Sequence, residues 1–370
     1  MAGIYVHIPF CASRCIYCGF YSTTGLRNLQ DRYVSALLKE MTLRGEYLRG
    51  ERIETLYIGG GTPSLLSAGN IARLGKALMP GHGVREFTME CNPDDITGEL
   101  CEAMVSAGVN RVSMGVQTFS DERLRFLHRR HQAHHIPKAI DTLRRAGIMN
   151  ISIDLMFGFP DESMEDWEAD IRQAIEMDVE HISAYSLMYE EGTPLHRMLK
   201  QGLLTENDDE LSAGMYSILR ERLSAAHYEH YEISNFARMG HRSMHNSNYW
   251  NGTPYIGLGA AAHSFDRQSR QWNVSNVEEY IQHIEGGTIP MERETIDART
   301  RYTDMITTAL RTCEGIDLSA LPPAEHDYII RYARRSLDAG LLTVEGTRMR
   351  LTEKGLFVSD DIMSDLIWVD

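Results

Sequence analysis

The first half of the chain alternates short strand-like runs with longer amphipathic helical runs. Strands that alternate with helices form parallel sheets, because each helix carries the chain back over the sheet through a right-handed crossover. We therefore expect an α/β fold with six βα units, arranged as a partial, open (β/α)6 barrel related to the TIM barrel. The strand-like runs lie at residues 4–8, 55–58, 87–89, 112–114, 151–155 and 181–185.

The pattern changes after about residue 200, so the chain divides into three predicted parts. Residues 1–200 would form the partial barrel, residues 201–290 a loop-rich connecting region, and residues 291–370 a C-terminal α+β unit. In the last part, a helical run at 328–337 precedes two short strand-like runs that flank a turn at Gly346. A hairpin that follows helices is typical of a winged-helix-like unit.

Composition narrows the class of protein. The 370 residues are 43% hydrophobic and 24% charged, as in ordinary globular proteins, and the net charge is −15. Such an acidic chain argues against a nucleic-acid-binding surface, so we expect a packing or lid role for the winged-helix-like unit. The chain has no apolar run long enough to span a bilayer, and it starts on a strand rather than a secretory leader. We therefore expect it to reside in the cytoplasm.

Three cysteines follow the first strand with the spacing C-x3-C-x2-C: Cys11, Cys15 and Cys18. Thiolates are the usual ligands of iron-sulfur clusters, and three of them would leave one iron of a 4Fe-4S cluster open to another ligand. A structural zinc site with His7 as the fourth ligand is an alternative interpretation. Disulfides are not favoured, because six cysteines in 370 residues do not make a cysteine-dense scaffold. The remaining cysteines are expected to be small core residues: Cys91, Cys101 and Cys313.

Polar and glycine residues gather at the carboxyl ends of the predicted strands. In barrels of this type those ends lie at one face, where the active site forms. Glycines let a ligand approach the backbone closely, because no Cβ intrudes. We expect these residues to share one site beside the three cysteines: Gly59, Gly60, Gly61, Thr62, Glu90, Asn92, Gln117, Asp154 and Tyr185.

With these motifs, the whole chain resembles the oxygen-independent coproporphyrinogen III oxidase-like branch of the radical S-adenosylmethionine (SAM) superfamily. Its opening, Tyr5-Val6-His7-Ile8-Pro9-Phe10-Cys11, is similar to the opening of that branch. The resemblance implies that the three cysteines hold a 4Fe-4S cluster, whose open iron takes exchangeable SAM. It also implies that the glycine loop at 59–62 holds the methionine amino group and that Arg129 can pair with the methionine carboxylate. The resemblance implies further contacts to SAM from Tyr5, Glu90, Gln117 and Asp154.

Two features distinguish the members of this branch. Coproporphyrinogen III dehydrogenases carry one more cysteine two positions after the third, and this chain has Phe20 there. Haem chaperones of the HemW type carry an aromatic residue at that position and an H-N-x-x-Y-W motif, which this chain has at 245–250. Imidazole is a usual axial ligand of haem iron, and aromatic rings suit a porphyrin face. The resemblance therefore implies haem binding by His245, Tyr249 and Trp250, whereas ordinary packing in a structural loop is the alternative.

The resemblance is strongest to these haem chaperones. It implies a cytosolic protein that holds the cluster and SAM, binds haem and delivers it to haem-requiring proteins. Such a protein needs an electron donor for the cluster, and contact with membrane haem proteins would be transient. Two alternatives are coproporphyrinogen III oxidase, which decarboxylates propionates in porphyrin biosynthesis, and a related radical SAM methyltransferase. Phe20 argues against the first and the intact H-N-x-x-Y-W motif against the second, although a scaffold of this kind can in principle cleave SAM.

Overall fold

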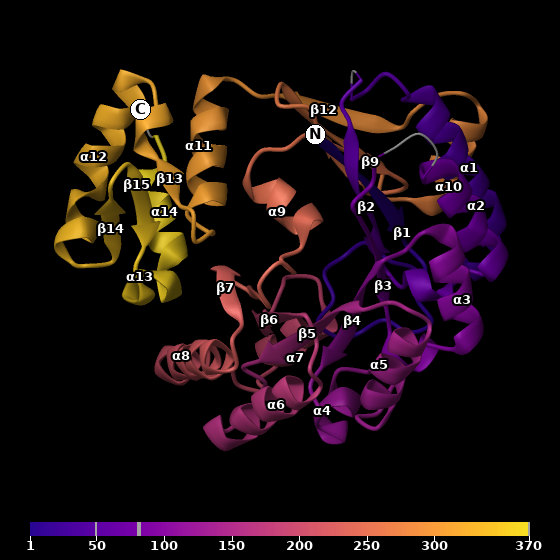
Figure 1. Ribbon diagram of the computed structural model, residues 1–370, viewed down its shortest axis with the longest axis horizontal. Coiled ribbons are helices and arrows are strands. Elements are labelled where there is room, and N and C mark those ends of the chain that lie inside the picture. The colour runs from indigo at the N-terminus through magenta and orange to yellow at the C-terminus, as the bar shows by residue number, and fades with distance from the viewer. Residues whose placement is uncertain (49, 80–82, 369–370) are drawn as a thin grey trace.

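The computed structural model describes residues 1–48, 50–79 and 83–368, and a large mixed sheet with helices around it dominates the fold (Figure 1). Six strands at the centre of this sheet lie where the sequence predicts them, and they pair in parallel and in chain order. The predicted α/β class with a parallel core is therefore confirmed. The six strands are β1 (Ala2–Ile8), β2 (Ile53–Gly60), β3 (Glu86–Cys91), β4 (Arg111–Gln117), β5 (Asn150–Phe157) and β6 (His181–Ser186).

Helices connect consecutive strands, as parallel pairing requires. Local signals set their ends. Ser163 and Asp166 form a capping box at the start of one helix, and Gly108 ends another in the left-handed conformation, with a φ of +93°. These helices are α1 (Gln30–Leu43), α2 (Ala68–Leu78), α3 (Gly98–Ala107), α4 (Asp121–Phe126), α5 (His135–Arg145), α6 (Met164–Glu176), α7 (Pro194–Lys200) and α8 (Asp209–Ala225), with short 3-10 turns η1 (Arg27–Leu29), η2 (Pro63–Leu65) and η3 (Pro93–Asp95).

The prediction of a loop-rich region after the barrel was wrong for most of residues 228–287. This stretch adds strands to both edges of the large sheet, because β9 pairs in parallel with β1 while β8 pairs antiparallel with β6. Its strands are only three to five residues long, so their alternation is too brief to stand out in the sequence. The elements are β7 (Glu229–Glu232), β8 (Asn235–Ala237), α9 (Met244–Trp250), β9 (Tyr255–Leu258), β10 (His263–Phe265), β11 (Ser269–Asn273), α10 (Val277–Glu285) and β12 (Met291–Thr295).

The C-terminal elements form a smaller α+β unit with an antiparallel sheet of order β13-β15-β14 and a separate hydrophobic core, which includes Ile306, Ile329 and Met349. The predicted hairpin is confirmed, and its turn contains Gly346 with a φ of +62°. Figure 1 shows this unit beside the large sheet, with α9 between the two. Its elements are α11 (Ala298–Ala309), β13 (Ile316–Asp317), η4 (Leu318–Ala320), α12 (Pro323–Asp338), β14 (Leu342–Glu345), β15 (Arg348–Leu351), α13 (Glu353–Phe357) and α14 (Ser359–Leu366).

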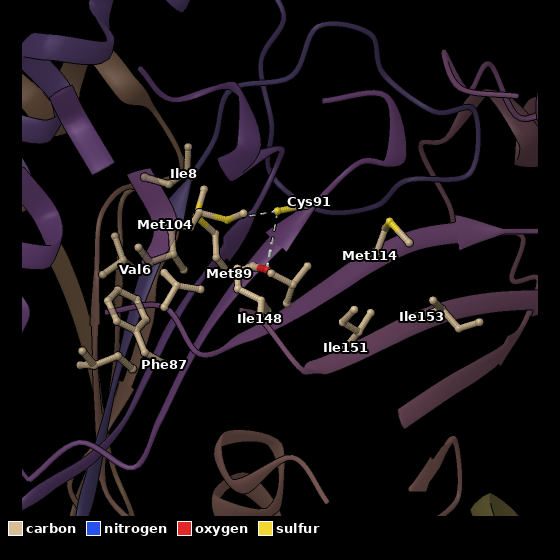
Figure 2. Packing of buried hydrophobic residues seen from close by; sticks show 14 of the residues in the cluster. Val6, Ile8, Phe87, Met89, Cys91, Met104, Met114, Ile148, Ile151 and Ile153 are labelled. Carbon is tan, nitrogen blue, oxygen red and sulfur yellow. Dashed lines mark hydrogen bonds between the residues drawn. The ribbon is translucent and has the colours of Figure 1, made fainter. Parts of the chain in front are cut away.

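The two faces of the central sheet differ in character. Figure 2 shows the apolar face, where side chains such as Val6, Met89 and Ile153 pack in the main hydrophobic core. Successive strand residues point to opposite faces, so the residues between these point the other way. We call that second face the inner face; it carries polar and aromatic side chains, including Tyr5, Tyr57, Thr88, Glu90, Ser113, Ser152 and Asp154.

Two of the three cysteines outside the C-x3-C-x2-C motif are buried core residues, as predicted, and the third is not. Cys91 and Cys101 are buried as expected, and the Cys91 sulfur lies 3.9 Å from the Met104 sulfur (Figure 2). Cys313 is exposed instead, because it lies in the turn after α11, where an Arg242 Nη2 contacts its sulfur. Within the described ranges, no helix is long and apolar enough to cross a membrane.

Candidate functional site

The three clustered cysteines lie in the loop after β1. Cys11 is buried, whereas Cys15 and Cys18 are partly exposed. The Thr62 hydroxyl donates to the Cys11 sulfur across 3.5 Å, and Arg129 Nη1 donates to the Cys15 sulfur across 3.6 Å. Burial raises the pKa of the Cys11 and Cys18 thiols, so both are protonated near neutral pH, and a metal deprotonates a thiol that it coordinates.

The histidine of the alternative zinc site is engaged elsewhere. His7 Nδ1 lies 3.0 Å from the Tyr5 hydroxyl, and His7 Nε2 lies 3.0 Å from the carbonyl oxygen of Tyr21. Burial lowers the pKa of His7 to about 4, so the ring is neutral. Over the described residues, no group of three or more His, Cys, Asp or Glu side chains is gathered tightly enough for a single metal ion. In this structure His7 therefore orders Tyr5 and the cysteine loop.

The glycine loop at the end of β2 lies directly against the cysteine loop. Gly60 has a φ of +113°, and a Cβ added there would lie 2.6 Å from the His7 ring. A Cβ added at Gly61 would lie 3.0 Å from the Cys11 sulfur and 2.9 Å from the Phe10 carbonyl oxygen. Glycine is needed at both positions, because a side chain at Gly60 would meet the His7 ring and one at Gly61 would fill the space beside the first cysteine. This cradle suits a group that is bound next to Cys11.

Glu90 ties the glycine loop to the inner face. One of its carboxylate oxygens accepts a hydrogen bond from the Gly60 N–H at 3.0 Å, and the other accepts one from the Tyr57 hydroxyl at 2.8 Å. Burial, with a smaller contribution from the Asp154 charge, raises the pKa of Glu90 to about 7. Each carboxylate oxygen can accept a second hydrogen bond, so Glu90 shapes the loop and can still bind a ligand.

Asp154 and Gln117 lie on the neighbouring strands. The Ser113 hydroxyl donates to an Asp154 oxygen at 3.3 Å, and burial raises the pKa of Asp154. Gln117 has a φ of +68° at an irregularity in the β4–β5 pairing, next to Gly115. Such a conformation costs a non-glycine residue about 1–3 kcal/mol, and a bulge redirects the side chain. This irregularity lies at the carboxyl end of β4, where the sequence predicts Gln117 as a site residue.

Arg129 joins the site from the chain after α4. Its Nη2 donates to the Asn92 side-chain oxygen and to the Gly115 carbonyl oxygen, each at 2.6 Å. Its Nε is buried and has no hydrogen-bond partner within the described ranges. A buried guanidinium N–H without a partner suits a carboxylate, as the predicted contact to methionine requires. The residues present therefore fit SAM bound beside the cysteines.

Aromatic rings connect this site to the H-N-x-x-Y-W motif. The Tyr5 and Tyr57 rings stack with centroids 6.1 Å apart, and the Tyr57 and His245 rings stack with centroids 5.0 Å apart. The motif lies in α9 rather than in the predicted loop. Two 2.8 Å hydrogen bonds from the N–H groups of Met244 and His245 to the Glu86 carboxylate anchor its first turn. The fold therefore brings residues about 190 positions apart into contact on the inner face.

His245 is buried, with 1% of its surface exposed. Its Nδ1 lies 2.9 Å from the Thr55 hydroxyl, and its Nε2 lies 3.0 Å from the Tyr249 hydroxyl. Burial lowers the pKa of His245 to about 3, so the ring is a neutral imidazole, the form in which histidines of haem proteins ligate iron. Both nitrogens already have partners, so axial ligation requires the Tyr249 hydroxyl to move away. Trp250 has a buried Nε1 without a hydrogen-bond partner among the described residues, and the Arg311 guanidinium lies 5.2 Å from its ring.

The predicted cysteines, glycine loop and strand-end residues therefore lie around one region, and His245 extends it along the inner face. Tyr185, at the end of β6, is 40% exposed at the rim. Several residues that form hydrogen bonds at this site were not predicted from the sequence, although the alternation of side chains along the strands places some of them on the inner face. The missed residues are Tyr57, Glu86 and Ser113.

Comparison with known proteins shows the family to which this chain belongs. The model of the radical SAM superfamily matches residues 5–174. The heme chaperone HemW of Mycobacterium tuberculosis is 34% identical over 373 residues, which cover 99% of this chain and 94% of that protein. This chain belongs to the HemW family. The HemW protein of Bacillus subtilis is 37% identical over 304 residues, which cover 81% of this chain and 80% of that relative. The predicted resemblance is therefore confirmed.

A solved structure shows the same fold as this HemW family member. It is coproporphyrinogen III oxidase (HemN) from Escherichia coli, which is described as a radical SAM enzyme. The TM-score is 0.86, and the match covers 99% of this chain and 90% of HemN at 22% sequence identity. Because the match spans nearly the whole chain, it includes the C-terminal α+β unit as well as the parallel sheet.

Proposed function

We propose that this protein is a cytoplasmic haem chaperone that holds a 4Fe-4S cluster and SAM, binds haem and delivers it to haem-requiring proteins. The relatives named above are heme chaperones, and the chain matches them over most of their length. The observation that carries the proposal is the contact between the two halves of the inner face. Tyr57 donates to Glu90 beside the cysteine loop and stacks on His245 of the H-N-x-x-Y-W motif.

Cys11, Cys15 and Cys18 would hold the cluster, and the backbone at 59–61 with Arg129 would bind the methionine part of SAM. Glu90, Gln117 and Asp154 would bind its polar groups, because they place acceptors and an amide around the same cradle. When bound, the cluster supplies an electron that can reduce SAM. The chain itself positions the two groups, and an external electron donor would be its partner.

His245, Tyr249 and Trp250 would bind haem in this proposal. The neutral imidazole of His245 would become available to iron when the Tyr249 side chain moves off Nε2 and uncovers the buried ring. Trp250 lies at the end of α9, where its unpartnered Nε1 and the stacked Arg311 suit a planar anionic ligand. The acceptor proteins would include haem enzymes, some of them contacted transiently at a membrane.

The fold shared with HemN makes coproporphyrinogen III oxidation the second candidate. Phe20 argues against it, since this side chain is 73% exposed at the position where the oxidases carry an extra cysteine. The test is anaerobic reconstitution with iron, sulfide and SAM, followed by two assays on the same preparation. We expect haem binding and transfer to an apo-haem protein, without conversion of coproporphyrinogen III. Turnover at ordinary enzyme rates, of order one per second or more, without haem transfer would contradict the proposal.

A further inference from the structure

The turn after α11 places an arginine on the last residue of the H-N-x-x-Y-W motif. The Arg311 guanidinium lies 5.2 Å from the centre of the Trp250 ring, and both side chains are partly exposed. Figure 1 shows α9, which ends at Trp250, between the large sheet and the C-terminal unit. The contact therefore joins the motif to the C-terminal unit, on the opposite side of α9 from the contact with the sheet.

The backbone of Arg311 is fixed by the segment that connects β7 to β8. The Ile233 N–H donates to the Arg311 carbonyl oxygen at 3.0 Å, and the Cys313 N–H donates to the Tyr231 carbonyl oxygen at 3.0 Å. The arginine side chain therefore extends from a backbone that is held on both sides. A ligand that binds the guanidinium loses less affinity to the ordering of the protein, because the donor is already positioned.

Two N–H donors at this contact lack an acceptor. Arg311 Nε and Trp250 Nε1 are both buried, and neither forms a hydrogen bond within the described ranges. The other guanidinium nitrogens of Arg311 form no hydrogen bond or ion pair with the part of the chain that the structure describes. Arginine and tryptophan side chains donate hydrogen bonds but cannot accept them. Unpaired donors on two touching side chains suit a ligand that only accepts, such as a carboxylate.

A carboxylate of the protein lies near Arg311 but has other partners. One Glu232 oxygen accepts hydrogen bonds from the Ser234 N–H and from the side-chain amide of Asn235, which hold the turn between β7 and β8. Glu232 forms no ion pair with Arg311 among the described residues, although the two side chains attract each other. Burial raises the pKa of Glu232 to about 7, so it is only partly ionised at neutral pH. Arg311 therefore keeps positive charge that a ligand can neutralise.

The geometry points to Arg311 as the residue that recognises a propionate carboxylate of haem, with the Trp250 N–H as a second donor. This inference rests on the proposed haem-binding function. Arginine binds a carboxylate through two parallel hydrogen bonds, and the propionates of haem extend from one edge of the macrocycle. Trp250 follows His245 by five residues in α9, which is about 7–8 Å along the helix axis. Iron bound at His245 would thus leave the propionate edge within reach of Arg311, and the site would select porphyrins with free carboxylates.

The experiment compares haem with haem dimethyl ester, in which both propionates are uncharged and the iron and the macrocycle are the same. Absorbance titration of each ligand into the full chain, in one detergent buffer, gives the two dissociation constants. We expect wild type to bind haem about tenfold more tightly than the ester, because a hydrogen bond between charged groups is lost in the ester. The ratio of the two constants is the measured preference for free carboxylates.

Variants assign this preference to individual side chains. Arg311→Met should bind haem about tenfold more weakly than wild type but the ester with unchanged affinity, so the preference disappears. Arg311→Lys should keep part of it, because lysine keeps the charge but not the paired donors. Trp250→Phe keeps an aromatic ring and loses the N–H, so the preference should fall about twofold to fivefold. Arg238→Met is the matched control, because the Arg238 guanidinium also lies over an aromatic ring, that of Tyr228, at 4.9 Å, but is paired with Asp178.

The outcomes separate the role of Arg311 from the proposed function. If wild type binds no haem, the proposed function is wrong and the role of Arg311 falls with it. If wild type binds haem and the ester equally, haem binding stands but the recognition of carboxylates is overturned. An equal loss of affinity for both ligands in Arg311→Met would show that Arg311 only packs against α9. If Arg311→Met does not fold, as judged by its melting temperature, Arg311→Gln decides, and a wild-type preference in that uncharged variant would overturn the inference.

Discussion

Tyr57 stacks on the imidazole of His245 with an interplanar angle of 28°, while its hydroxyl donates to Glu90 at 2.8 Å. One side chain of β2 thus contacts both the glycine-loop site and the H-N-x-x-Y-W helix. Glu90 in turn holds the Gly60 N–H beside Cys11. A change in the position of α9 would therefore reach the glycine loop through three successive contacts: His245 with Tyr57, Tyr57 with Glu90, and Glu90 with Gly60.

The cysteine prediction is tested by iron and sulfide content. Changing Cys11, Cys15 or Cys18 to Ala should abolish the cluster, because two thiolates do not hold it well. Anaerobically reconstituted wild type should contain about four iron and four sulfide per chain, as a 4Fe-4S cluster requires. Control substitutions at Cys91, Cys101 and Cys313 should leave the metal content unchanged. Stoichiometric zinc in place of iron would show that the cluster assignment is wrong.

The SAM prediction concerns two carboxylates. Asp154→Ala and Glu90→Ala should each weaken SAM binding by about 1–3 kcal/mol, because hydrogen-bonding groups of the ligand and the protein lose their partners. Glu90→Ala also frees the Gly60 N–H and the Tyr57 hydroxyl, so its effect should be the larger of the two. Isothermal titration with normal cluster content is the measurement. Equal affinity in both variants and wild type would exclude these residues from the SAM site.

A third prediction concerns stability against pH. The pKa of Glu90 is about 7 in the folded chain and 4.5 as its ordinary value, so the folded state binds this proton more tightly. The stabilisation from this proton is complete below about pH 4.5 and is lost as the pH rises through 7. Glu90→Gln does not titrate and so lacks this loss, and the stability of the variant relative to wild type should therefore improve by about 2–3 kcal/mol between pH 5 and pH 8.

Melting temperatures of wild type and Glu90→Gln over that pH range are the measurement. Glu162 and Glu232 also have pKa values of about 7, but they are common to both proteins and cancel in the difference. A difference that stays constant from pH 5 to pH 8 would show that Glu90 has an ordinary pKa in the folded protein.

The haem prediction follows from the contact between Tyr249 and His245. Tyr249→Phe keeps the ring and its edge contact with Tyr255 but removes the hydroxyl that lies 3.0 Å from His245 Nε2. If the iron takes that nitrogen, haem affinity should rise about twofold to tenfold, the equivalent of one net hydrogen bond. His245→Ala should weaken binding or change the haem spectrum, and Trp250→Ala should have a smaller effect.

Absorbance titration of haem into the three variants, with SAM affinity as the control, distinguishes the roles. SAM affinity should stay within about twofold of wild type in Tyr249→Phe, because only one hydroxyl at the far side of His245 is lost. Unchanged haem binding in all three variants would assign the H-N-x-x-Y-W segment to packing, which was the alternative interpretation of the motif.

The sequence alone was sufficient to predict the secondary-structure elements that depend on a local pattern of apolar and turn residues. The alternation of apolar runs predicted the six parallel strands, and the hairpin around Gly346 followed from its turn residues. The grouping of the cysteines, the glycine loop, Glu90 and Asp154 could also be predicted, because carboxyl ends of parallel strands lie at one face whatever the details of packing.

Tertiary structure decided the features that depend on contacts between distant segments. The strands within 228–273 form only because the edges of the sheet are already present to pair with them. The burial of His245 against Thr55 and Tyr57 has no signature in the sequence. A residue type and its spacing define which chemistry a side chain can perform. Its charge state and its available atoms are set by neighbours that only the folded chain brings within reach.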